Sequence, residues 1–145
     1  MQVGKIFVKI NLETEIFDGD DRQRTSVTSE GELFQTDRQS VVRFTEKNKD
    51  QPDVATMVTI KPNQLSIKRS GEVEMNQKFE LERTTEMVYR HQFGSLRMET
   101  TTHDFKYQPL TTKENAKLTI NYTTVLDGEE EREHKLLLTI EEDKS

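Results

Sequence analysis

The sequence has no cysteine and no tryptophan, and only three prolines in 145 residues. Without cysteine it has no disulfide, no thiolate nucleophile and no cysteine-based zinc site, which fits a reducing cytoplasm. Apolar residues are scarce at 31%, and 33% of residues are charged, a balance that raises the question of disorder. Leu, Ile, Val and Phe still make up about 24% of the chain, above the roughly 20% typical of disordered chains.

A long apolar run is also missing. No stretch approaches the length of a membrane span, and the first ten residues alternate apolar residues with lysine, unlike a signal peptide. We therefore expect a soluble, cytoplasmic protein without membrane contact. The length predicts one domain, residues 1–145.

The net charge of −6 is spread unevenly. Residues 1–60 carry −3, residues 61–97 carry +2 and residues 98–145 carry −5. An acidic chain repels phosphate backbones, so we expect no nucleic-acid partner. An alternative, RNA contact through the basic middle third, would depend on Lys61, Lys68, Arg69, Arg90 and Arg97.

The chain is rich in strand-like alternation of apolar and polar residues. Residues 5–17 place Ile6, Val8, Ile10, Leu12 and Ile16 on one face. Further strands are expected near residues 22–34, 39–45, 55–60, 65–68, 72–81, 86–92, 95–102, 104–107, 116–126 and 130–140. No segment has a helical period. The pattern predicts an all-β fold of about 8–11 strands, an up-and-down antiparallel barrel or a sandwich; we favour the barrel because the first strand could pair with the last.

Turn chemistry predicts how the hairpins pair. A three-residue loop Arg69-Ser70-Gly71 would set Ile67 opposite Val73, Leu65 opposite Met75 and Lys68 opposite Glu72. The last hairpin would pair Leu118 with Leu138, Ile120 with Leu136 and Tyr122 with His134. Around Phe93-Gly94, Tyr89 would face Met98 and His91 would face Leu96. Residues 46–53 are expected to form a hydrated loop, and Gly31 a bulge or bend.

The run Ile60 to Phe79, with Arg69-Ser70-Gly71-Glu72-Val73 and Met75 at its centre, followed by Tyr89, Phe93-Gly94 and the closing hairpin, resembles the YwiB-like family. The family consists of small bacterial proteins of unknown function with a calycin-type, lipocalin-like β-barrel. The family often has a Pro-aromatic-Gly turn, and here Gln92 stands in place of the proline. The resemblance implies a fold but no catalytic residues.

Motifs for chemistry are missing. The three histidines, His91, His103 and His134, have no metal-ligand spacing, and no phosphate loop or nucleophile elbow occurs. The acidic segment Asp18 to Asp21 is typical of a hairpin turn and lacks the ligand series of a calcium loop. The predicted loop explains Ser70 without a nucleophilic role. We therefore expect no cofactor, no metal and no enzymatic activity.

Several polar residues fall on the apolar side of the predicted strands: Gln77, Tyr89, His91, Thr100, Tyr122 and His134. Buried polar groups need partners, so they form either a satisfied network in a filled barrel or the lining of a pocket. The leading functional hypothesis is a non-enzymatic barrel that binds a small, partly apolar ligand, with or without an anionic group. Its predicted contacts are Met75, Phe79, Tyr89, Met98 and Tyr122, with Arg69 at the mouth.

The outer face offers an alternative. Three apolar residues, Phe7, Phe34 and Leu137, point away from the predicted core. Closure of the barrel would bring the first strand, with Phe7, next to the last strand, with Leu137. A contiguous apolar patch there would bind a protein partner or a second copy of the chain, whereas scattered exposed apolar residues would mean nothing.

Overall fold

The computed structural model describes residues 4–48, 51–71, 74–91, 93–129 and 131–144, with the backbone alone for Asn48, Gln51, Tyr89 and His91. The described residues form ten strands: β1 (Lys5–Asp18), β2 (Asp21–Gln35), β3 (Ser40–Asn48), β4 (Gln51–Ile60), β5 (Gln64–Ser70), β6 (Met75–Glu80), β7 (Thr84–His91), β8 (Gly94–Gln108), β9 (Ala116–Leu126) and β10 (Glu131–Glu142). The prediction of an all-β barrel is confirmed.

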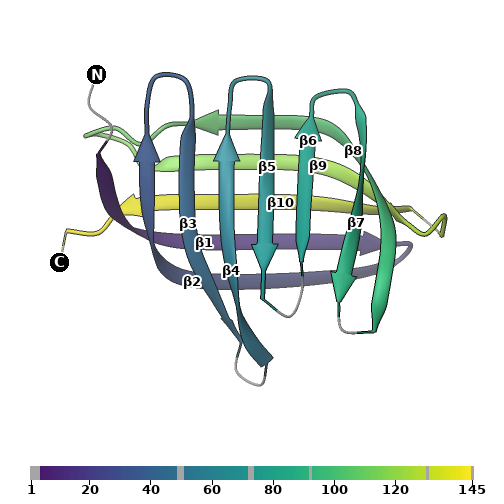
Figure 1. The fold of residues 1–145 in the computed structure, drawn as a ribbon. Coiled ribbons are helices and arrows are strands. Elements are labelled where there is room, and N and C mark those ends of the chain that lie inside the picture. The colour runs from purple at the N-terminus through teal and green to yellow at the C-terminus, as the bar shows by residue number, and fades with distance from the viewer. Residues whose placement is uncertain (1–3, 49–50, 72–73, 92, 130, 145) are drawn as a thin grey trace.

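The strands form one sheet in the order β6-β5-β4-β3-β2-β1-β10-β9-β8-β7, and every neighbouring pair is antiparallel. The first strand pairs with the last, as predicted, with Ile10 opposite Ile140. Figure 1 shows two layers, in which β3 to β7 run across the long strands β1, β9 and β10. The sheet thus folds back on itself and encloses its apolar face.

Two long strands, β2 and β8, pass from one layer to the other (Figure 1). β2 pairs with β1 along its length but with β3 only from Gly31 to Gln35. A Cβ at Gly31 would lie 2.4 Å from the Arg43 carbonyl oxygen and 2.6 Å from Ile10 Cδ1. The register is continuous at Gly31, so the residue provides a close approach rather than a bulge. In β8 the register shifts between Thr102 and Asp104, and such shifts let a strand turn a corner.

The barrel closes where the two ends of the sheet meet, between β6 and β7. Glu74 and Arg90 exchange two backbone hydrogen bonds of 2.9 and 3.0 Å. The Thr85 hydroxyl also donates to the Lys78 carbonyl at 2.6 Å. Pairing of β1 with β10 therefore leaves the seam in the middle of the chain, where two isolated bridges, Glu74–Arg90 and Leu81–Thr102, close it.

The inward side chains change from apolar to polar along the barrel. On β5 the inward series is Leu65, Ile67 and then Arg69, and β10 ends its aliphatic series at His134. We call the two regions the apolar end and the polar end. The apolar end contains Val8, Ile10, Leu33, Val42, Ile60, Leu65, Phe79, Leu118, Leu138 and Ile140, all at most 2% exposed. The polar end contains Thr14, Glu46, Thr56, Arg69, Gln77, Thr100, Tyr122, Thr124 and His134.

The predicted register of the last hairpin is confirmed. Leu118 pairs with Leu138, Ile120 with Leu136 and Tyr122 with His134. Asp127 and Gly128 form the turn with φ values of 50° and 74°, a region that these two residue types tolerate. Local turn chemistry and inward pattern agree here.

The predicted register of the central hairpin is wrong. Ile67 pairs with Gln77, Leu65 with Phe79 and Lys68 with Asn76. The reason lies in the neighbouring strand, because Ser70 of β5 pairs with Ala55 of β4 and is part of the sheet rather than of a tight turn. The predicted partners Glu72 and Val73 lie outside the described residues. The shift is an even number of residues, so the same face still points inward.

Two further expectations are corrected. Tyr89 pairs with Leu96, and His91 pairs with Gly94, so β7 ends and β8 begins one residue earlier than predicted. The expected loop at residues 46–53 is largely strand, since β3 continues to Asn48 and β4 begins at Gln51. The prediction of a loop rested on the polar composition of this stretch. A hairpin whose faces are exposed to solvent needs few apolar residues, so polar composition does not exclude strands.

Candidate functional site

A cavity of about 370 Å³ opens inside the barrel at its polar end. Ligand pockets in proteins usually begin at roughly 300 Å³. The lining residues come from eight strands: Leu12, Thr14, Ile16, Thr25, Val27, Glu46, Ile67, Arg69, Met75, Gln77, Met98, Tyr122, Thr124, His134 and Leu136. It forms because the inward side chains at this end do not fill the barrel as the apolar end is filled.

An ion pair spans part of the cavity wall. Arg69 Nε lies 3.1 Å from Glu46 Oε2, and the two side chains are only 28% and 14% exposed. The Thr56 hydroxyl donates to the same carboxylate oxygen at 2.5 Å. The divergence of β2 from β3 beyond Gly31 leaves room for this pair to face the interior. The Arg69–Glu46 pair is therefore a partly buried ion pair.

Aromatic rings form another part of the wall. The Tyr122 and His134 rings stack with their centroids 4.6 Å apart and 5° between their planes, and the Phe79 and Tyr122 rings form a T-shaped contact with centroids 4.9 Å apart. Burial raises the pKa of Tyr122 to about 12, although the Arg69 guanidinium opposes this shift. Burial lowers the pKa of His134 to about 4, helped by the Arg132 guanidinium. Both rings are therefore uncharged at neutral pH.

Hydrogen bonds satisfy most of the buried polar groups around the cavity. Gln77 Nε2 donates to Thr100 Oγ1 at 2.9 Å, and Thr124 Oγ1 bonds to His134 Nε2 at 2.7 Å. Among the described residues, Thr102 Oγ1 is the one side-chain nitrogen or oxygen that is inaccessible to solvent and has no hydrogen-bond partner. The wall is thus held together by its own hydrogen-bond network.

A side chamber of about 450 Å³ adjoins the cavity and shares Met98, Thr124 and His134 with it. The rest of its lining is Asp18, Leu126, Glu129 and Arg132. Arg132 Nε lies 3.5 Å from Asp18 Oδ2. The polar end therefore offers two adjoining spaces, one inside the barrel and one beside its turns.

Four of the six predicted ligand contacts line the cavity: Arg69, Met75, Met98 and Tyr122. Phe79 is fully buried and supports the Tyr122 ring from the core instead. The side chain of Tyr89 lies outside the described part of the structure. Sequence reasoning did not find Glu46, because its position was assigned to a loop; the inward parity of β3 after Phe44 was the signal that could have found it.

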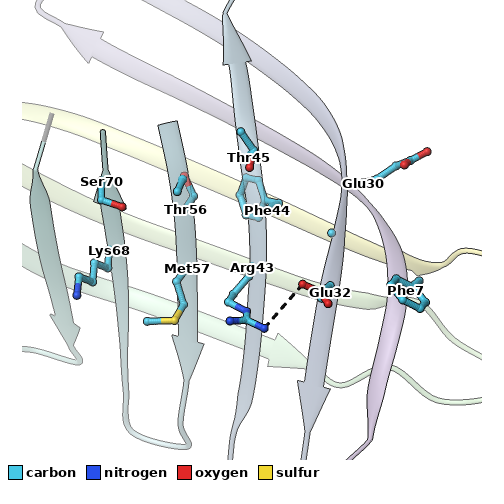
Figure 2. A pocket seen from close by; sticks show the side chains of 12 residues that line it. Phe7, Glu30, Glu32, Arg43, Phe44, Thr45, Thr56, Met57, Lys68 and Ser70 are labelled. Carbon is cyan, nitrogen blue, oxygen red and sulfur yellow. Dashed lines mark ion pairs between the residues drawn. The ribbon is translucent and has the colours of Figure 1, made fainter. Parts of the chain in front are cut away.

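A second hollow, of about 580 Å³, lies on the outer surface over β1 to β5. Figure 2 shows its side chains, with Phe7 at one side, Met57 and Lys68 at the other, and the Arg43–Glu32 ion pair between them. Phe7 is 61% exposed. This hollow is a surface feature, separated from the cavity by the sheet.

The predicted outer residues do not form one patch. The Phe7 carbonyl accepts a hydrogen bond from Asp143 N, and Leu137 lies six residues earlier on that strand, about 20 Å away. The Arg43 guanidinium lies 4.9 Å from the Phe34 ring centroid and covers that ring. Phe7 is therefore the exposed member of the three.

Other candidate residues are scattered. Arg69 faces the cavity, whereas Lys68 faces outward, so the residues considered for RNA contact lie on different faces. Ser70 is exposed at the end of β5. The described residues contain no group of three or more His, Asp or Glu side chains that could hold a metal ion. No helix in the described parts of the chain is long and apolar enough to cross a membrane.

The geometry defines a ten-stranded antiparallel β-barrel with a cavity at one end. Residues 10–138 match the family described as Domain of unknown function (DUF1934), and the chain belongs to that family. A curated relative, the uncharacterized β-barrel protein YwiB of Bacillus subtilis (strain 168), is 31% identical over 88 residues. That match spans 61% of this chain and 61% of the relative.

The fold resembles a solved structure as well. The crystal structure of ywiB protein from Bacillus subtilis superposes with a TM-score of 0.85 and 21% sequence identity, covering 98% of this chain and 96% of the other. The predicted YwiB-like resemblance is confirmed. The family's function is unknown, so any activity has to be inferred from the cavity.

Proposed function

We propose that this protein is a non-enzymatic binding barrel that holds one small, partly apolar molecule in the cavity at its polar end. The observation that carries the proposal is the cavity of about 370 Å³ enclosed by Met75, Met98, Tyr122 and the Arg69–Glu46 pair. Apolar walls with a few convergent polar groups are typical of ligand sites. A barrel with one filled end and one open end resembles lipocalin-like, calycin-type binding proteins, and we propose that this chain acts in the same general way, in the cytoplasm.

Native mass spectrometry tests the proposal directly. We expect protein purified from its own host to carry a small molecule that disappears when the same preparation is denatured. The mass of that molecule would identify the ligand. A ligand-free protein that also fails to bind any small apolar probe would contradict the proposal.

A pair of variants locates the binding. Met98→Trp places a large ring in the cavity, and we expect it to abolish binding of the co-purified molecule or a probe. Val88→Trp is the matched control, because Val88 is 50% exposed on the outer face of the adjacent strand. Equal binding by both variants would place the ligand elsewhere.

The alternative, a protein-interaction module or homodimer using Phe7, Phe34 and Leu137, has less support. Phe7 is exposed beside an outer hollow, but Leu137 lies far from Phe7 and the Arg43 guanidinium covers the Phe34 ring. Phe7→Asp with measurement of the oligomeric state tests it. A change from dimer to monomer would favour this alternative, whereas an unchanged monomer would speak against it.

A further inference from the structure

We propose that the cavity selects by charge: it takes an uncharged or singly cationic ligand and rejects a carboxylate of the same size, and Glu46 is the residue that sets this preference. The inference depends on the proposed function and adds the chemical class of the ligand. It also departs from the expectation that Arg69 at the mouth would attract an anion.

The first observation is that the positive charge of Arg69 is already neutralised. Glu46 accepts a hydrogen bond from Arg69 Nε, and both side chains line the cavity. An anionic ligand would have to approach Arg69 beside a carboxylate that is 14% exposed. Like charges in a partly buried site repel strongly, since little water screens them.

No other group in the cavity supplies a positive charge. His134 is uncharged near neutral pH because burial lowers its pKa to about 4. The remaining polar lining consists of hydroxyl and amide groups, on Thr14, Thr25, Gln77, Tyr122 and Thr124. The formal charge of the lining is therefore zero, with the positive charge held by its own partner.

The adjoining side chamber adds negative charge. Asp18 and Glu129 face a single Arg132, and Arg132 is paired with Asp18. Glu129 has no ion pair among the described residues. A ligand that extends from the cavity into the side chamber therefore meets an excess of one carboxylate, which favours an ammonium group over a carboxylate.

Three probes with one fluorophore test the inference. Dansylamide is uncharged, dansylglycine carries a carboxylate, and dansyl-ethylenediamine carries an ammonium group. We measure each dissociation constant from the rise in dansyl fluorescence with the wild-type protein near neutral pH. We expect the amide and the ammonium probe to bind at least about tenfold more tightly than the carboxylate, as for one close like-charge contact.

The two members of the ion pair give opposite predictions. Glu46→Gln leaves Arg69 without its counter-ion, and we expect dansylglycine to bind about tenfold more tightly than to wild type. Arg69→Gln leaves Glu46 unpaired, so dansylglycine should weaken further and dansyl-ethylenediamine should gain. Glu30→Gln is the matched control, because it removes the same charge from an exposed position on the outer surface.

The outcomes separate the two proposals. If none of the three probes binds, the proposed function fails and this inference fails with it. If the probes bind equally, or if dansylglycine binds best in the wild type, the charge preference is wrong and the binding barrel stands. If Glu30→Gln changes the order of the probes as much as Glu46→Gln does, net charge rather than Glu46 sets the preference. Circular dichroism confirms that each variant is folded, and Arg69→Gln keeps the test decisive should Glu46→Gln unfold.

Discussion

The two ends of the barrel are built from the same strands, but one end is a buried apolar core and the other surrounds a polar cavity. At the apolar end, Phe79, Leu33 and Leu118 are completely buried in the core. At the polar end, the same strands carry Arg69, Glu46 and His134 around a cavity of about 370 Å³. The filled end stabilises the fold, and the open end can therefore keep polar groups and empty space that would be costly in an unsupported core.

The largest predicted loss of stability comes from a substitution at the apolar end. Phe79→Ala removes a fully buried ring and its contact with Tyr122, and we expect a loss of about 4 kcal/mol in the free energy of unfolding. Met98→Ala at the polar end should cost only about 1 kcal/mol, because its half-buried side chain already faces a cavity. Chemical denaturation of both variants measures the contrast. Equal losses would mean that the two ends contribute alike to stability.

The next prediction concerns the point where β2 leaves β3. Gly31→Val places a side chain against the Arg43 carbonyl and Ile10, and we expect a cost of about 3 kcal/mol. Gly4→Val is the control, since a Cβ at Gly4 meets nothing within 4 Å, and its effect should stay within about 0.5 kcal/mol. Thermal unfolding of the two variants tests this. A neutral Gly31→Val would show that the close approach is not needed.

A pH prediction follows from His134 at the polar end. Its folded pKa of about 4 lies below the ordinary 6.5, so the unfolded chain binds a proton first and the associated stability is lost as pH falls from 6.5 towards 4. Allowing for partial exposure, we expect the wild type to lose about 1 to 2 kcal/mol more than His134→Gln between about pH 7 and 4.

The comparison with His134→Gln isolates this group. Arg132, Asp18 and Glu129 face the same chamber as His134, and all three are unchanged between the two proteins. Denaturant unfolding of both proteins at several pH values measures it. Parallel stability profiles for the two proteins would show that His134 is protonated as easily in the folded state as in the unfolded one.

The smallest predicted effect compares two tyrosines. At the apolar end the Tyr107 hydroxyl donates to Ser40 Oγ at 3.0 Å, so Tyr107→Phe should cost about 1 kcal/mol. The Tyr122 hydroxyl has no hydrogen-bond partner among the described residues, and Tyr122→Phe should change the free energy of unfolding by less than about 0.5 kcal/mol. We expect Tyr122→Phe to alter probe binding instead. The reverse order of stabilities would contradict the assignment of roles to the two ends.

A register was predicted correctly where contacts within the hairpin specify it, and wrongly where contacts with a distant strand specify it. The β9–β10 hairpin is paired as predicted, because its turn residues and inward pattern specify the same alignment. The β5–β6 hairpin is not, because β4 holds Ser70 in the sheet through Ala55, and that contact is distant in sequence. Both registers nevertheless keep the same face inward, which is why four predicted contacts reach the cavity.

The sequence by itself determined the all-β fold, the pairing of the first and last strands and the face that each strand turns inward, because alternation with a period of two is a local property. The tertiary structure alone decided that the polar inward residues gather at one end, that Glu46 meets Arg69, and that the seam falls between β6 and β7. These features depend on the register of neighbouring strands and on the positions where β2 and β8 bend. Packing between residues far apart in the chain determines the register and the bends.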